Sequence, residues 1–178
     1  MLSDKVIDAL QSIIDGERET FIELVAERFR NEVPLQEKLL EALKPVVPGL
    51  VREKSYAQSG AKCDFWCPND DGSESWVELK LCPTNYCKAF GDSKKSIAIT
   101  QQIGQVILDC QKLSKIAPRH ERKIVLLAYP MPIGGDHSRW TTHTDWILEH
   151  AQGISRRGQT VVRRGSAEAA INVYQIDV

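Results

Sequence analysis

Residues 62–82, KCDFWCPNDDGSESWVELKLC, constrain the fold more than any other stretch of this chain. Two runs with alternating side-chain character flank Asp70-Asp71-Gly72, which is a typical signal for a β-hairpin. The length of the loop decides which side chains share a face, because a slip of one residue moves every side chain to the other face. A two-residue turn at Asp71-Gly72 would mix apolar and charged residues on both faces. A three-residue loop, with Gly72 in the left-handed conformation, separates them.

The three-residue loop is therefore our prediction, and it places Asp64 opposite Glu78. One face is then apolar and consists of Cys63, Phe65, Cys67, Val77, Leu79 and Leu81. The other face carries Lys62, Asp64, Trp66, Trp76, Glu78 and Lys80. Directly opposed carboxylates destabilise a strand pair unless a cation lies near them. Lys80 supplies part of that charge, and two carboxylates with water and phosphate oxygens form a typical Mg²⁺ site.

The remaining patterns predict a mixed α/β or α+β domain with a central mixed β-sheet flanked by helices. A chain of 178 residues fits one domain. Helices are expected at 3–14, 17–31, 35–44 and 96–115, with a further helix after a capping box at Thr142-x-x-Asp145. Besides the hairpin, strands are expected at 50–57, 123–129, 159–164 and 171–177, and residues 83–95 are expected to form a loop.

Bulk properties favour a cytoplasmic protein without a membrane partner. The N-terminus lacks the features of a secretory signal, and no run approaches the ~18 apolar residues that cross a bilayer. Residues 112–164 carry ten basic and four acidic residues, a bias compatible with a polyanionic partner. The five cysteines fit reduced thiols. Cys63-x3-Cys67 with Cys82-x4-Cys87 leaves open a zinc or iron–sulfur site, although Cys63 and Cys67 on one straight strand lie ~13 Å apart.

Asp64 followed by Glu78-Leu79-Lys80 on the partner strand resembles the signature of the PD-(D/E)xK nuclease superfamily, which has the restriction-endonuclease-like fold. The resemblance covers residues 33–130 and includes a preceding helix with Glu37-x-x-Leu40-x-x-Leu43. Residues 1–32 would then be a helical N-terminal extension, and residues 131–178 a C-terminal helix and strands. The family's proline is absent before Asp64, where Lys62-Cys63 stands instead.

The resemblance implies an Mg²⁺-dependent (or Mn²⁺-dependent) endonuclease acting on DNA. Asp64, Glu78 and a helix glutamate, Glu37 or alternatively Glu41, would bind the metal, and Lys80 would orient water and phosphate. The implied helper residues are Gln101 or Gln102 on the following helix and the phosphate-binding Lys88, Lys94 and Lys95. A homodimer would allow both DNA strands to be cut. The competing interpretations are a catalytically inactive member of the same fold, serving as a nucleic-acid-binding or protein-interaction module, and the cysteine-ligated metal protein.

Overall fold

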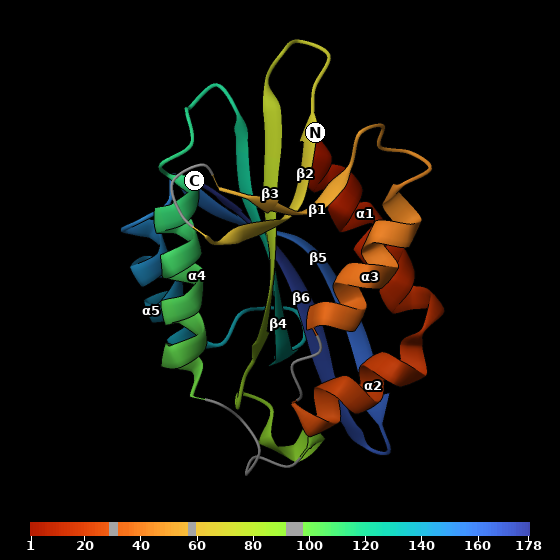
Figure 1. Ribbon diagram of the computed structural model, residues 1–178. Helices are drawn as coiled ribbons and strands as arrows, with labels where there is room; N and C mark the ends of the chain where they lie inside the picture. Colours follow the sequence, from red (N-terminus) through yellow and green to blue (C-terminus); the bar gives the residue numbers. More distant parts are fainter. Residues whose placement is uncertain (29–31, 57–59, 92–97) are drawn as a thin grey trace.

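The computed structural model is a three-layer arrangement in which one β-sheet separates two groups of helices (Figure 1). It describes residues 1–28, 32–56, 60–91 and 98–178. On one face lie α1 (Leu2–Gly16), α2 (Arg18–Glu27) and α3 (Glu32–Leu43), and on the other lie α4 (Ile99–Leu113) and α5 (Ser138–Leu148). The strands are β1 (Val51–Ser55), β2 (Lys62–Pro68), β3 (Glu74–Pro83), β4 (Glu121–Met131), β5 (Gly153–Arg164) and β6 (Ala167–Asp177). A short 3₁₀ helix, η1, spans Lys88–Phe90.

The described strands form a mixed six-stranded sheet in the order β1-β2-β3-β4-β6-β5. The pairs β1–β2, β2–β3, β4–β6 and β5–β6 are antiparallel, and β3 pairs with β4 in parallel. A parallel pair needs a crossover, and α4 provides it. This crossover brings α4 against β3, the strand that carries Glu78 and Lys80. The predicted mixed α/β class is therefore correct.

Two apolar cores lie on the two faces of the sheet. α1 shows why the first core forms: Val6, Leu10 and Ile14 recur at helical spacing and are buried against the sheet. The second core joins α4 and α5 to the opposite face. As a central strand, β3 is buried on both faces along almost its whole length. A charged side chain in its middle is consequently costly unless other groups compensate for it.

The hairpin has the predicted register. Phe65 pairs with Val77 and Pro68 with Glu74, so Asp64 is the next position opposite Glu78. The N–H of Asn69 donates to the carbonyl oxygen of Ser73 at 2.9 Å, which closes a three-residue loop. Gly72 has φ +77°, the left-handed conformation that this loop needs.

Cys63 departs from the predicted face. It lies in the core under α4 with Tyr56 and Trp76, whereas Phe65 belongs to the core under α1 to α3. The regular β2–β3 pairs begin at Phe65, and the Asp64 side chain accepts the N–H of Leu79. The alternation of faces is therefore interrupted at Asp64, which the sequence pattern did not reveal.

Other differences concern the ends of elements. The helix expected after Thr142 begins earlier, at Ser138, because His137 caps it by accepting the N–H of Arg139. Strands β4, β5 and β6 extend beyond the predicted runs. The loop expected at 83–95 contains η1. Residues 92–95 of that loop and residues 96–97 of the helix expected at 96–115 lie outside the described residues. None of the described helices combines the length and apolar character that crossing a bilayer requires.

The hairpin loop yields a stability prediction. Gly72→Ala forces a side chain into the left-handed region, and we expect it to lower the free energy of unfolding by about 1 kcal/mol. Gly135→Ala is the matched control, because its added Cβ meets nothing within 4 Å and its φ is not positive. Urea unfolding of both variants checks this. Equal stability of the two variants would contradict the loop conformation.

Candidate functional site

Asp64 on β2 and Glu78 on β3 bring their carboxyl groups into contact. A hydrogen bond joins the two side chains. Each carboxyl group also accepts a hydrogen bond from outside the pair: Tyr56 Oη donates to Glu78 Oε1 at 2.6 Å, and the N–H of Leu79 donates to Asp64 Oδ2 at 2.8 Å. Two acids from adjacent strands are thus held in fixed positions on one side of the sheet.

The backbone is distorted beside Asp64. Arg52 pairs with Phe65 and Lys54 with Cys63, so Glu53 is the residue of β1 whose position faces Asp64. Glu53 has φ +58°, a conformation that is strained for a residue with a side chain. Such strain is concentrated at functional sites in proteins. The distortion coincides with the point at which Asp64 turns toward Glu78.

Burial and mutual repulsion change the protonation of the pair. Burial, together with the negative charges of Asp64 and Asp109, raises the pKa of Glu78 to about 8. Burial also raises the pKa of Asp64, although the hydrogen bond from Leu79 and the charge of Lys80 oppose this effect. Since only 3% of Glu78 is exposed, water cannot screen the repulsion well. The pair therefore retains a proton near neutral pH, and this proton reduces the repulsion between the two carboxyl groups. A bound cation would reduce the same repulsion.

Lys80 is held beside this pair by an aspartate that our sequence analysis missed. Asp109, on the buried face of α4, lies with Oδ2 3.2 Å from Lys80 Nζ and with Oδ1 2.6 Å from Lys112 Nζ. Burial alone would lower the pKa of Lys80, but the carboxylates of Asp109, Glu32, Asp64 and Glu78 raise it. The ammonium charge is therefore maintained. The sequence did contain a signal, because Asp109 occurs within the apolar stripe of α4.

Glu32, and not Glu37, is the α3 glutamate near the pair. Glu32 Oε1 accepts the N–H of Leu81 at 3.2 Å, and its charge acts on Asp64 and Lys80. The Glu37 side chain is 60% exposed and lies 3.5 Å from Arg52 on β1. The sequence pattern predicts a helix with Pro34 in its first turn, whereas α3 begins at Glu32, so the prediction overlooks Glu32. The alternative, Glu41, is exposed.

The other predicted helper residues are dispersed. Gln101 is exposed, whereas Gln102 is buried on α4 and its Nε2 has no hydrogen-bond partner among the described residues. Lys88 is exposed in η1. Lys94 and Lys95 lie outside the described residues. Of the two glutamines, the structure places only Gln102 on the face of α4 that packs on the sheet.

The donor set suits a hard divalent ion better than a soft one. In the described ranges, no three His, Cys, Asp or Glu side chains come together as a metal-binding group. Asp64 and Glu78 are two carboxylates, which is a sufficient protein contribution for Mg²⁺ when water and phosphate complete its shell. Cys63 and Cys67 belong to different cores, so this part of the chain does not gather the thiolates that zinc or an iron–sulfur cluster needs.

Ion pairs with acidic side chains compensate much of the basic bias of residues 112–164. Ion pairs join Lys123 to Asp177, Arg156 to Asp136, Arg157 to Asp4 and Arg163 to Glu168. Lys112 is bound to Asp109. Sequence composition alone therefore overstated the free positive charge of this half of the chain.

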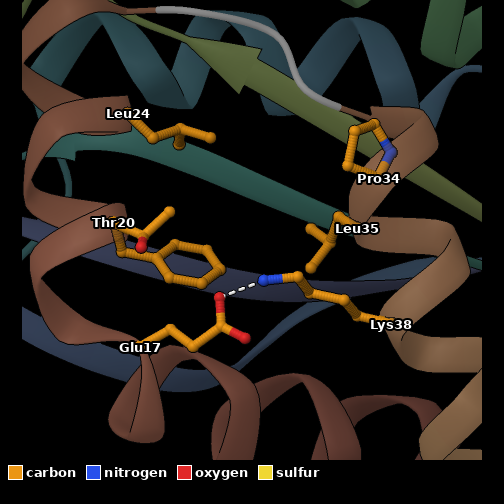
Figure 2. A pocket seen from close by; sticks show the side chains of 7 residues that line it. Glu17, Thr20, Leu24, Pro34, Leu35 and Lys38 are labelled. Atoms are coloured by element: carbon orange, nitrogen blue, oxygen red, sulfur yellow. Dashed lines mark hydrogen bonds and ion pairs between the residues drawn. The ribbon is translucent and has the colours of Figure 1, made fainter.

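A small cavity between α2 and α3 is not part of this site. Its volume is about 80 Å³, and Figure 2 shows the ion pair of Glu17 with Lys38 among the side chains that line it, which include Leu24 and Leu35. Neither Asp64 nor Glu78 lines it.

The chain was compared with protein-family models, curated proteins and solved structures, and none of the three comparisons gave a match.

The raised pKa of Glu78 predicts how stability depends on pH. The folded state binds one proton more than the unfolded state between the ordinary pKa of 4.5 and about 8. Stability should therefore fall as pH rises through this interval, by up to about 1.4 kcal/mol per pH unit. Glu78→Gln removes this contribution, so its stability relative to the wild type should increase with pH.

Urea unfolding in chelator between pH 5 and 8 measures this difference. The exposed Glu149→Gln is the control and should follow the wild type. A constant difference between Glu78→Gln and the wild type across the interval would mean that Glu78 titrates normally.

Proposed function

We propose that this chain is a metal-dependent nuclease that hydrolyses DNA phosphodiester bonds, with Mg²⁺ or Mn²⁺ bound by Asp64 and Glu78. One observation carries the proposal. The two carboxyl groups, on adjacent strands, are in contact, and Lys80, two residues after Glu78 on β3, lies beside them on the same face. Contact between a buried acid and a half-buried one is unfavourable unless a positive species lies between them or a proton is shared. A divalent ion meets that need and is also what phosphodiester hydrolysis uses.

The residues around the pair have separable roles in this proposal. A bound ion would supply an activated water and stabilise the charge that develops on the phosphoryl oxygens. Tyr56 and the N–H of Leu79 orient the two carboxylates. Lys80 keeps its proton, and its ammonium group would bind a phosphate oxygen or orient the attacking water. Asp109 positions Lys80 from α4.

The order of elements supports the same proposal by analogy. Between α3 and β4 the chain forms a helix, three antiparallel strands, a helix and a strand parallel to the third. This is the order that the resemblance to PD-(D/E)xK nucleases implies for residues 33–130. The pair lies on the second and third of these strands. A shared fold does not establish a shared activity, so the site carries more of the argument than the topology.

The burial of Glu78 favours one competing candidate, a non-catalytic nucleic-acid-binding module of the same fold. With only 3% of Glu78 exposed, a shared proton could satisfy the pair without any metal. In that case nucleic acid would bind nearby without being cut. The following experiment separates the two candidates.

Asp64→Asn should reduce metal-dependent nicking of plasmid DNA by about 10²-fold or more, because it removes one charged ligand and alters the shared hydrogen bond. Asp70→Asn, in the exposed hairpin loop, is the matched control and should retain wild-type activity. Nicking is measured with Mg²⁺ and Mn²⁺ and again after addition of chelator. A wild-type protein that does not nick DNA with either metal, or nicking that survives Asp64→Asn, would refute the nuclease.

The two α3 glutamates give a second prediction. Glu32→Gln should weaken nicking several-fold, since its charge acts on both Asp64 and Lys80. Glu37→Gln should leave nicking within about twofold of the wild type, because its partner is Arg52 on the surface. Initial nicking rates at saturating metal measure both. The reverse order of effects would restore Glu37 as the metal-binding helix residue.

A further inference from the structure

A cavity of about 470 Å³ lies beside the carboxyl pair, between β1, β3 and the segment that follows α4. Its size is within the ~300–1,000 Å³ range of typical ligand pockets. The wall nearest the pair is formed by Tyr56 and Trp76, and Ile116 and Ala117 line the side after α4. No described residue of α1, α2 or α3 contributes to this cavity.

The rings of the aromatic wall contact one another. The rings of Tyr56 and Trp76 stack with centroids 5.3 Å apart and planes 18° from parallel. Trp66 meets Trp76 edge to face at 6.3 Å, and Trp76 Nε1 donates to Glu74 Oε2 at 3.0 Å. Tyr56 and Trp76 are each only 7% exposed, so the wall presents a limited part of its rings to the cavity. Ala61, Ile116 and Ala117 supply the more exposed apolar lining around a planar group. A nucleobase is a planar group of this kind, and contact with protein aromatics stabilises it.

The charge at the rim is predominantly positive. Lys54, Lys112 and Lys115 line the cavity, and Glu74 is the acid on its lining, already engaged by Trp76. Lys54 Nζ lies 4.3 Å from the centroid of the Trp66 ring, and Lys115 is exposed. An aromatic wall with a lysine rim complements a base that carries phosphates on either side.

Two sets of contacts join the cavity to the candidate site. Tyr56 lines the cavity with its ring and donates its hydroxyl hydrogen to Glu78. Lys112 lines it too, and it binds Asp109, which in turn binds Lys80. Tyr56 therefore separates an occupant of the cavity from Glu78, and Lys112 and Asp109 separate it from Lys80.

We propose that this cavity binds one unpaired nucleotide of the nucleic acid, with its base on the Tyr56–Trp76 wall and its phosphates at the lysine rim. A base inside a duplex is stacked between its neighbours and cannot enter such a cavity. The substrate class that follows is single-stranded or locally unpaired DNA. The inference rests on the proposed function only for the position of the cut phosphate, and base binding can be measured without cleavage.

The test uses oligonucleotides that contain the fluorescent base 2-aminopurine, with chelator present so that no cutting occurs. Stacking quenches this base, so the wild-type protein should quench it in a single strand, and much less when the same strand is fully paired. An abasic single strand should compete at least about tenfold less well than the intact strand.

Two exposed positions test the cavity itself. Ala117→Phe places a ring in it, and Lys115→Glu reverses one rim charge. Each should weaken binding at least about fivefold, and Ala117→Phe should also abolish the quenching. Lys44→Glu, an exposed charge reversal beyond the end of α3, is the control and should bind like the wild type.

The outcomes distinguish this inference from the nuclease. Quenching that is lost in Ala117→Phe supports the cavity even if the wild type never cuts DNA with any metal. Cleavage of DNA without quenching, or equal quenching by Ala117→Phe and the wild type, overturns the cavity and leaves the nuclease standing. Equal affinity for the abasic and intact strands also overturns it, because charge alone would then explain binding.

Discussion

The contact between the carboxyl groups of Asp64 and Glu78 is the constraint on which the rest of the site depends. The sheet brings two acids together where burial makes their repulsion strong. Tyr56 and the N–H of Leu79 each stabilise one acid, and Lys80 supplies positive charge nearby. At neutral pH, a shared proton offsets the repulsion that these groups leave uncompensated. A divalent ion is the alternative that gives this arrangement a chemical use.

Acidic side chains from the helices on both faces of the sheet also contact the site. Asp109 reaches Lys80 from α4, and Glu32 binds the backbone of β3 from α3 on the other face. The parallel crossover between β3 and β4 is what brings α4 to this position. The candidate site is consequently assembled by packing between elements distant in sequence. The hairpin contributes two acids and a lysine, and the helices determine how those charges are compensated.

How much the sequence predicts differs between local and tertiary features. The hairpin register could be predicted because Gly72 and the alternation of side chains are both local signals. The start of α3 and the inward face of α4 depend on tertiary packing, so Glu37 was named in place of Glu32 and Asp109 was missed. The reversal of Cys63 had the same origin, since the Asp64 side chain interrupts the strand pairing in a way that no residue pattern encodes.

Anomalous diffraction from crystals soaked in Mn²⁺ tests the central claim most directly. If the pair is a metal centre, the anomalous map will contain a peak in contact with the carboxyl oxygens of both Asp64 and Glu78, and this peak will be absent from Asp64→Asn crystals. A wild-type map without density between the two carboxyl groups, or with its strongest peak at the cysteines, would contradict the account. The pair would then be a proton-sharing structural contact.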